Sequence, residues 1–166
     1  RRQRQMCIRD SHKPVEYYAA YFTVRSENLD GAIAMQGHKA VRDKMNNIKQ
    51  KQSVHEATAK DEAEYQTLQI VNEMMARKIE FLPVDIYKSE AKMFKVEDGK
   101  IRLPFSSLPG VGGAAADSLA ETGKHTEYLS IEDMQIKTKV TKAVIETLKD
   151  VGVLNNLPES SQMSLF

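Results

Sequence analysis

The stretch Leu108-Pro109-Gly110-Val111-Gly112, followed by the small run Gly113-Ala114-Ala115-Ala116, decides how the rest of the sequence is interpreted. Proline fixes φ and glycine adopts backbone conformations that side chains block, so the stretch predicts a tight turn. The small run predicts a helix that ends at Gly123. The first amides of such a helix lack an intrahelical acceptor and therefore form an anion site. The commonest linear polyanion is a nucleic-acid backbone, so the turn supplies our first candidate DNA contacts: Leu108, Gly110, Val111, Gly112, Gly113 and Ala114.

A second stretch, from Ile131 to Val151, predicts another helix, short turn and helix, without the glycines. Ser130 opens a pattern that resembles a capping box, and Thr141 caps the second helix. No acidic residue occurs between Met134 and Ile145. Side chains around this turn could therefore replace backbone amides as phosphate contacts, and the candidates are Lys137, Lys139, Thr141 and Lys142.

The segment before the first turn predicts one β-hairpin, the only sheet that we expect. Asp98-Gly99 separates two alternating apolar runs, and Asp-Gly in that setting is the strongest short hairpin signal. The segment from Phe81 to Tyr87 is expected to be extended and is interrupted by Pro83.

The first half of the sequence predicts helices. Aromatic residues recur at helical spacing after Pro14, and we interpret them as core rather than as a stacking platform for bases: Tyr17, Tyr18, Tyr21 and Phe22.

A later helix, over 38–52, has one strongly basic face, with Lys39, Arg42, Lys44, Lys49 and Lys51 against Asp43 alone. Two interpretations stay open. This face either contacts phosphates or is a solvated surface that answers the acids of the next helix.

Composition narrows the class of protein. A hydrophobic content of 41% and a charged content of 28% in 166 residues are ordinary for a soluble globular chain. No apolar run approaches the length of a membrane span. The single Cys7 excludes disulfides and cysteine-based zinc sites, which fits the cytoplasm. The net charge of +1 excludes coating of DNA by charge alone, so a nucleic-acid role must come from local sites.

The two ends of the chain differ from the rest. Residues 1–11 show no periodicity, and we expect either a non-native leader or a disordered basic arm. From Leu157 the sequence turns polar, yet it ends on two large apolar residues with no local core to enter. This pattern predicts a short linear motif that docks into a partner's groove, formed by Gln162, Met163, Ser164, Leu165 and Phe166.

Leu108 to Gly112 resembles the helix-hairpin-helix motif, a sequence-independent binder of the DNA backbone. Further blocks follow in order along almost the whole chain after His12, among them Pro14 to Phe22, Asn72 to Arg77, Val84 to Ala91, Leu129 to Met134 and Leu157 to Phe166. In series these blocks resemble the carboxy-terminal part of the alpha subunit of PolC-type bacterial DNA polymerase III. Two positions depart from the family pattern: Gly113 replaces a charged residue, and Met163 replaces a leucine of the clamp-binding motif.

The resemblance implies a mainly α fold, in which a helical fingers segment is followed by a β-hairpin and a tandem helix-hairpin-helix domain. It assigns residues 12–84 to the fingers region, 85–156 to the duplex-binding domain and 157–166 to a flexible clamp-binding tail. The implied partners are double-stranded DNA, a sliding clamp and other replisome subunits, with no membrane.

The implied parent enzyme is a DNA-directed DNA polymerase that uses magnesium. The family's catalytic carboxylates lie in a palm domain that is not represented here, so this stretch should hold no catalytic residue, metal or cofactor and should be inactive alone. Two alternatives stay open from the residues themselves. One is a helix-hairpin-helix accessory protein of DNA repair or recombination, and the other is a helical scaffold without a DNA role.

Overall fold

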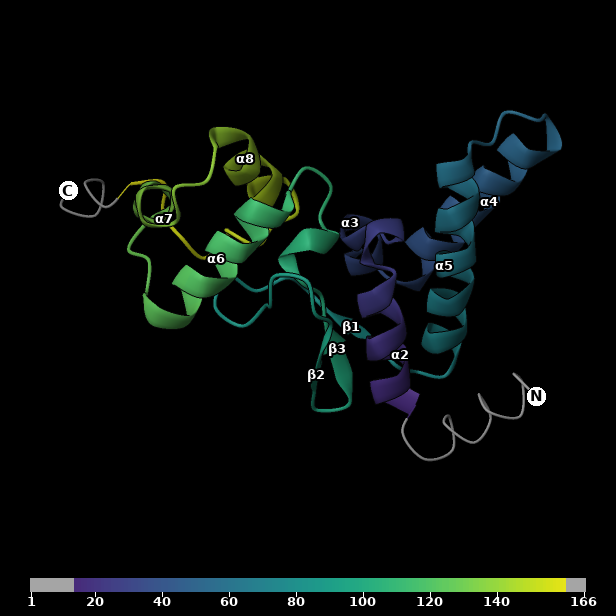
Figure 1. The fold of residues 1–166 in the computed structure, drawn as a ribbon, viewed down its shortest axis with the longest axis horizontal. Coiled ribbons are helices and arrows are strands. Elements are labelled where there is room, and N and C mark those ends of the chain that lie inside the picture. Colours follow the sequence, from purple (N-terminus) through teal and green to yellow (C-terminus); the bar gives the residue numbers. More distant parts are fainter. Residues whose placement is uncertain (1–13, 161–166) are drawn as a thin grey trace.

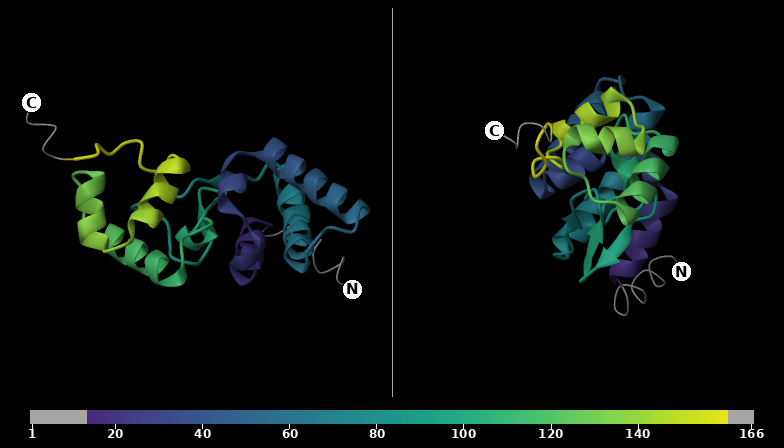
Figure 2. Two further views of the ribbon diagram at one scale, coloured as in Figure 1. Left: turned by 90° about the horizontal axis from the view of Figure 1, so that it is seen from above. Right: turned by 90° about the vertical axis from the view of Figure 1, so that its left-hand side faces the viewer.

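A computed structural model describes residues 14–160. The predicted leader (1–11) and the predicted docking residues Gln162 to Phe166 lie outside this part of the chain. Within it the fold is mainly α, with one small sheet, as the sequence predicts. Figure 1 shows the sheet between two groups of helices, and Figure 2 shows the same order from above.

The first group of helices precedes the sheet. Its elements are α2 (Pro14–Val24), the 3-10 helix η1 (Ser26–Asn28), α3 (Gly31–Met35), α4 (His38–Ser53) and α5 (Ala59–Ala76). Side chains cap two of them: Asp30 accepts the amides of Ala32 and Ile33, and Thr58 forms a capping box with Asp61. Tyr18 and Phe22 are fully buried, which confirms that the aromatic stripe of α2 is core.

The sheet contains the predicted hairpin and one further strand. Strands β2 (Lys95–Glu97) and β3 (Lys100–Arg102) are antiparallel, and both turn residues have positive φ, 50° at Asp98 and 76° at Gly99. Strand β1 (Phe81–Leu82) pairs in parallel with β3 on its other edge. The predicted hairpin is therefore confirmed, and the extended segment at Phe81 adds a third strand to its sheet.

An aromatic cluster joins the sheet to α2. The rings of Phe22 and Phe81 lie 5.4 Å apart, those of Phe22 and Phe94 5.7 Å, and those of Phe81 and Phe94 6.2 Å, measured between centroids. Together with the pairing of β1 and β3, this cluster crosses the division predicted between residues 84 and 85. The two predicted parts therefore share one hydrophobic core.

The second group of helices follows the sheet. Its elements are the 3-10 helix η2 (Phe105–Ser107), α6 (Gly113–His125), α7 (Ile131–Thr138) and α8 (Lys142–Asp150). Helix α6 continues through Gly123, so the predicted end of the helix at that glycine was wrong. A Cβ at Gly123 would collide with the Ile86 carbonyl oxygen, and glycine there permits close packing on the backbone.

The first residues of the predicted tail belong to the folded part. The amide of Ile131 donates to Pro158 O at 2.8 Å, and that of Glu132 donates to Glu159 O at 3.2 Å. Leu157 packs against the core. This segment thus satisfies orphan amides at the start of α7. No helix in residues 14–160 is both long and apolar enough to cross a membrane.

Candidate nucleic-acid interface

The first hairpin is a β-turn that leads directly into α6. Val111 N–H donates to Leu108 O at 3.2 Å, and Gly110, the third residue of the turn, has φ 89°. Proline at the second position and positive φ at the third are typical of a type II turn. The side chains of Leu108 and Val111 are buried, whereas Gly110, Gly112, Gly113 and Ala114 are exposed. Two of the predicted DNA contacts therefore anchor the turn, and the other four present backbone to the solvent.

The start of α6 has no side-chain cap. Its N-cap residue is Gly112, and the first intrahelical bond runs from Ala116 N to Gly112 O at 2.9 Å. Helices α5, α7 and α8 are each capped by a hydroxyl, from Thr58, Ser130 and Thr141. Among the described residues, no group accepts a hydrogen bond from the amides of Gly113, Ala114 and Ala115. These amides are therefore available to an external anion at the start of α6.

The second hairpin shares three consecutive features with the first: a residue of positive φ, a buried valine and the N-cap residue of the helix that follows. Lys139 has φ 60° where the first turn has Gly110, and Val140 is buried as Val111 is. Thr141 then occupies the N-cap position that Gly112 occupies in α6. Positive φ is uncommon for a lysine, so this turn keeps the hairpin geometry despite its side chain.

Each hairpin contacts a helix of the other motif. Ser118, on α6, donates a hydrogen bond to the carbonyl of Thr138 at the end of α7. In the opposite direction, Thr147 of α8 lies beside the first turn, with its Oγ1 3.3 Å from the position of a Cβ on Gly110. The two hairpins are thereby held in a fixed spatial relation.

The three predicted lysines differ in their surroundings. Lys137 lies 2.9 Å from Asp133 and donates to Glu127 O at 3.2 Å, so its ammonium points back along α7. The Leu129 amide first, and then Lys137, lower the pKa of the Asp133 carboxyl. Lys139 and Lys142 are exposed and have no ion pair within residues 14–160. The structure therefore places two of the three lysines at the turn with their charge available.

Lys92 is a cation at this site that the sequence did not indicate. Its Nζ lies 3.7 Å from the position of a Cβ on Gly113, at the start of α6. The contact arises because Phe105 N and Ser106 N donate to Glu90 O and Ala91 O, both at 3.0 Å, so the two segments run side by side. Nothing local around Lys92 signals this neighbour, which is 21 residues away in sequence.

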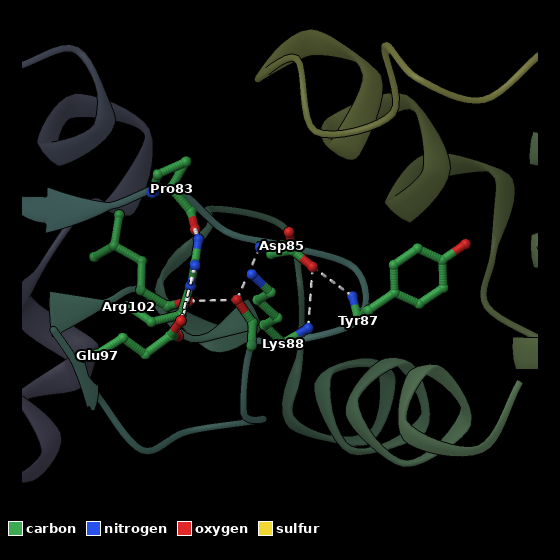
Figure 3. Close-up of polar contacts among 8 residues, drawn as sticks. Pro83, Asp85, Tyr87, Lys88, Glu97 and Arg102 are labelled. Atoms are coloured by element: carbon green, nitrogen blue, oxygen red, sulfur yellow. Dashed lines mark hydrogen bonds and ion pairs between the residues drawn. The ribbon is translucent and has the colours of Figure 1, made fainter. Parts of the chain in front are cut away.

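A polar network anchors the loop that carries Lys92 (Figure 3). Arg102 donates to both carboxylate oxygens of Glu97, at 2.8 and 3.0 Å, and to Pro83 O at 3.0 Å. Asp85 accepts the amides of Tyr87 and Lys88 at 2.8 and 3.0 Å. The loop leaves the sheet in a defined direction and meets α6 at Gly123.

Residues 14–160 contain no group of three acidic, histidine or cysteine side chains that could hold a metal ion.

The chain belongs to the helix-hairpin-helix family, whose motif model matches residues 78–163. More particularly, it is similar to a segment of DNA polymerase III PolC-type, as the ordered sequence blocks predict. It is 37% identical to the Thermotoga maritima protein of that name over 155 residues, 40% identical to that of Clostridium perfringens and 41% identical to that of Halalkalibacterium halodurans. These matches cover 92 to 93% of the chain but only 10 to 11% of each relative, so the chain spans about a tenth of their length.

Proposed function

We propose that this chain is the part of a replicative DNA-directed DNA polymerase that holds the backbone of duplex DNA without sequence preference. The observation that carries the proposal is that both hairpins place a positive-φ residue and a buried valine directly before the N-cap of a helix, and that one of these helices begins with uncapped amides. The names of the relatives favour a polymerase over a repair or recombination accessory protein.

In this proposal each hairpin holds one phosphate by different chemistry. The amides of Gly113, Ala114 and Ala115 and the ammonium of Lys92 bind the first phosphate, because all are donors at the positive end of α6. Lys139 and Lys142, beside Thr141, bind the second. Lys137 is the weakest of the predicted contacts since Asp133 already neutralises it. Contacts of this kind position a duplex without reading its bases, which suits an enzyme that must slide.

The chemistry of the parent enzyme lies elsewhere in this proposal. Its catalytic carboxylates and magnesium belong to parts outside these residues, and the chain alone has no polymerase activity. The parent works in the cytoplasm with other replisome subunits. The chain contributes affinity for the product duplex, which a binding assay measures.

The salt dependence of duplex affinity tests the phosphate contacts. Two or three neutralised phosphates give a slope of log K against log salt of about −2 to −3, equal for duplexes of different sequence. Lys92→Gln should reduce the magnitude of the slope by about 1. Labelled duplexes titrated between low and moderate salt measure both quantities. A slope near zero, or a strong sequence preference, would contradict the proposal.

We further propose that the residues Gln162 to Phe166 dock on a sliding clamp, with Leu165 and Phe166 as apolar anchors and Gln162 as a polar orienter. Tethering to a clamp raises the effective concentration of the hairpins at DNA without stronger DNA contacts. Met163 is apolar and adaptable, so it should weaken docking little compared with leucine.

Deleting Leu165 and Phe166 should abolish capture of the chain by an immobilised clamp and leave duplex affinity unchanged. Replacing Ser164 by alanine removes no apolar anchor and serves as the control. Capture that persists after the deletion would refute the docking motif.

A further inference from the structure

The basic residues of helix α4 form two rows along the helix, and only one row lies near acidic side chains of α5. Lys51 lies 3.8 Å from Asp61 of α5. The pKa of Asp61 is lowered first by the Thr58 amide and also by the charges of Lys51 and Lys44. Burial raises the pKa of Glu64 above its ordinary value, and the charge of Lys44 partly opposes this rise. This row is the solvated, acid-facing surface that one interpretation of the sequence predicts.

The second row projects from another side of α4. Arg42 and Lys49 are seven residues apart, about two helical turns, and Lys39 precedes Arg42 by one turn. All three are exposed, and none forms an ion pair within residues 14–160. The charge of this row is therefore not used by the fold.

A pocket of about 200 Å³ lies between this row and α5. Its lining contains no acidic side chain and consists of Arg42, Met45, Asn46 and Lys49 from α4 with Tyr65 and Asn72 from α5. The nearest carboxylate along α4, Asp43, diverges by about 100° around the helix and does not line it.

The polar groups of this pocket are mostly donors. Arg42 supplies a guanidinium fork, and Lys49 supplies an ammonium. His38 Nε2 lies 2.5 Å from Asn72 Oδ1, which occupies the acceptor of that amide and leaves its NH₂ for a ligand. The lining thus carries two cations and no acidic side chain, and cations of this kind form charge-assisted hydrogen bonds with oxyanions.

We propose that this pocket binds a phosphate group, carried either by a nucleic-acid strand or by a free nucleotide. The site is distinct from the hairpins, because its lining comes from α4 and α5 alone and includes no residue of either hairpin. It would give the chain a second point of contact with phosphate, formed by helices that the helix-hairpin-helix motif does not include.

The test compares two double variants of the full chain that each remove two positive charges from α4. Arg42→Gln with Lys49→Gln empties the pocket of its cations, whereas Lys44→Gln with Lys51→Gln alters only the acid-facing row. Inorganic triphosphate and a short labelled single-stranded DNA are the probes. Side-chain amide NMR signals of Asn46 and Asn72 report binding at the pocket itself, and thermal unfolding confirms that both variants are folded.

The proposal predicts that the pocket variant binds about tenfold more weakly, as expected for loss of charged hydrogen bonds, and that the control variant stays within about twofold of the unmodified chain. A loss confined to the DNA identifies a strand as the phosphate source, and a loss confined to triphosphate identifies a free nucleotide. Equal losses in both variants, or amide signals that do not shift with either probe, would overturn the proposal. Neither result would affect the hairpin site, whose salt dependence is measured on duplex DNA.

Discussion

Two glycines of α6 show how position decides what a residue does. Gly123 lies where the helix meets the backbone at Ile86, so even a methyl group has no room. Gly113 lies at the start of the same helix, and its nearest neighbour, Lys92, would be 3.7 Å from an added Cβ. The first glycine is required by packing, and the second leaves space at the proposed phosphate site.

Replacing Gly123 by alanine should destabilise the chain by about 1–3 kcal/mol, because the new methyl group forces α6 away from a carbonyl that cannot yield. Gly113→Ala is the matched control. It should be neutral or stabilising by up to about 1 kcal/mol, since alanine is the better helix former. Urea unfolding measures both. Equal effects of the two substitutions would refute the close approach at Gly123.

At the scale of elements, the small sheet is held by one well-shielded ion pair. Arg102 is 7% exposed, and its guanidinium binds Glu97 and the carbonyl of Pro83 at the point where the chain leaves the sheet. The Arg102 hydrogen bond lowers the pKa of Glu97 below its ordinary value. The ionised carboxylate therefore stabilises the fold above the ordinary glutamate pKa, and this contribution is lost as the pH falls through the lowered one.

Glu97→Gln should cost about 1–3 kcal/mol at neutral pH, and the cost should shrink on acidification below the ordinary glutamate pKa of about 4.3. The control is Glu80→Gln, which breaks an exposed pair with Lys100 at 3.6 Å and should cost at most about 1 kcal/mol. Unfolding free energies across this pH range measure the difference. A pH-independent cost at Glu97 would show that the pair is not the cause.

The parts of the fold that the sequence predicts are those with local signals. The turns at Gly99 and Gly110 and the cap at Thr141 each follow from residues within a few positions, and all occur in the structure. The pairing of β1 with β3 joins residues 20 positions apart in sequence, so no local pattern predicts it.

The candidate site has the same limit. Lys92 reaches α6 only through contacts between distant segments. The partner of Lys137 is Asp133, which lies one helical turn before that lysine and just outside the acid-free stretch from which its availability was predicted. A search for stretches without acidic residues misses Asp133, because this partner lies four residues before Lys137 and outside the stretch. Local patterns thus predict hairpins, whereas the set of charges around them needs the tertiary structure.

At the scale of the whole molecule, one core joins both groups of helices, and contacts of Ser118 and Thr147 hold the two hairpins in a fixed relation. The central claim is that the start of α6 holds a DNA phosphate. Gly110→Glu would be an ambiguous test, because φ there is 89° and any side chain is strained. Gly113 has no such strain, so a carboxylate can be placed at the site without distorting the turn.

The most direct measurement is the affinity of labelled duplex DNA at low salt for Gly113→Glu and Gly113→Ala. Both variants restrict the backbone similarly, and only one adds negative charge where the phosphate is proposed to lie. The account predicts that the alanine variant binds within about twofold of the unmodified chain and that the glutamate variant binds at least about tenfold more weakly. Equal affinities of the two folded variants would contradict it.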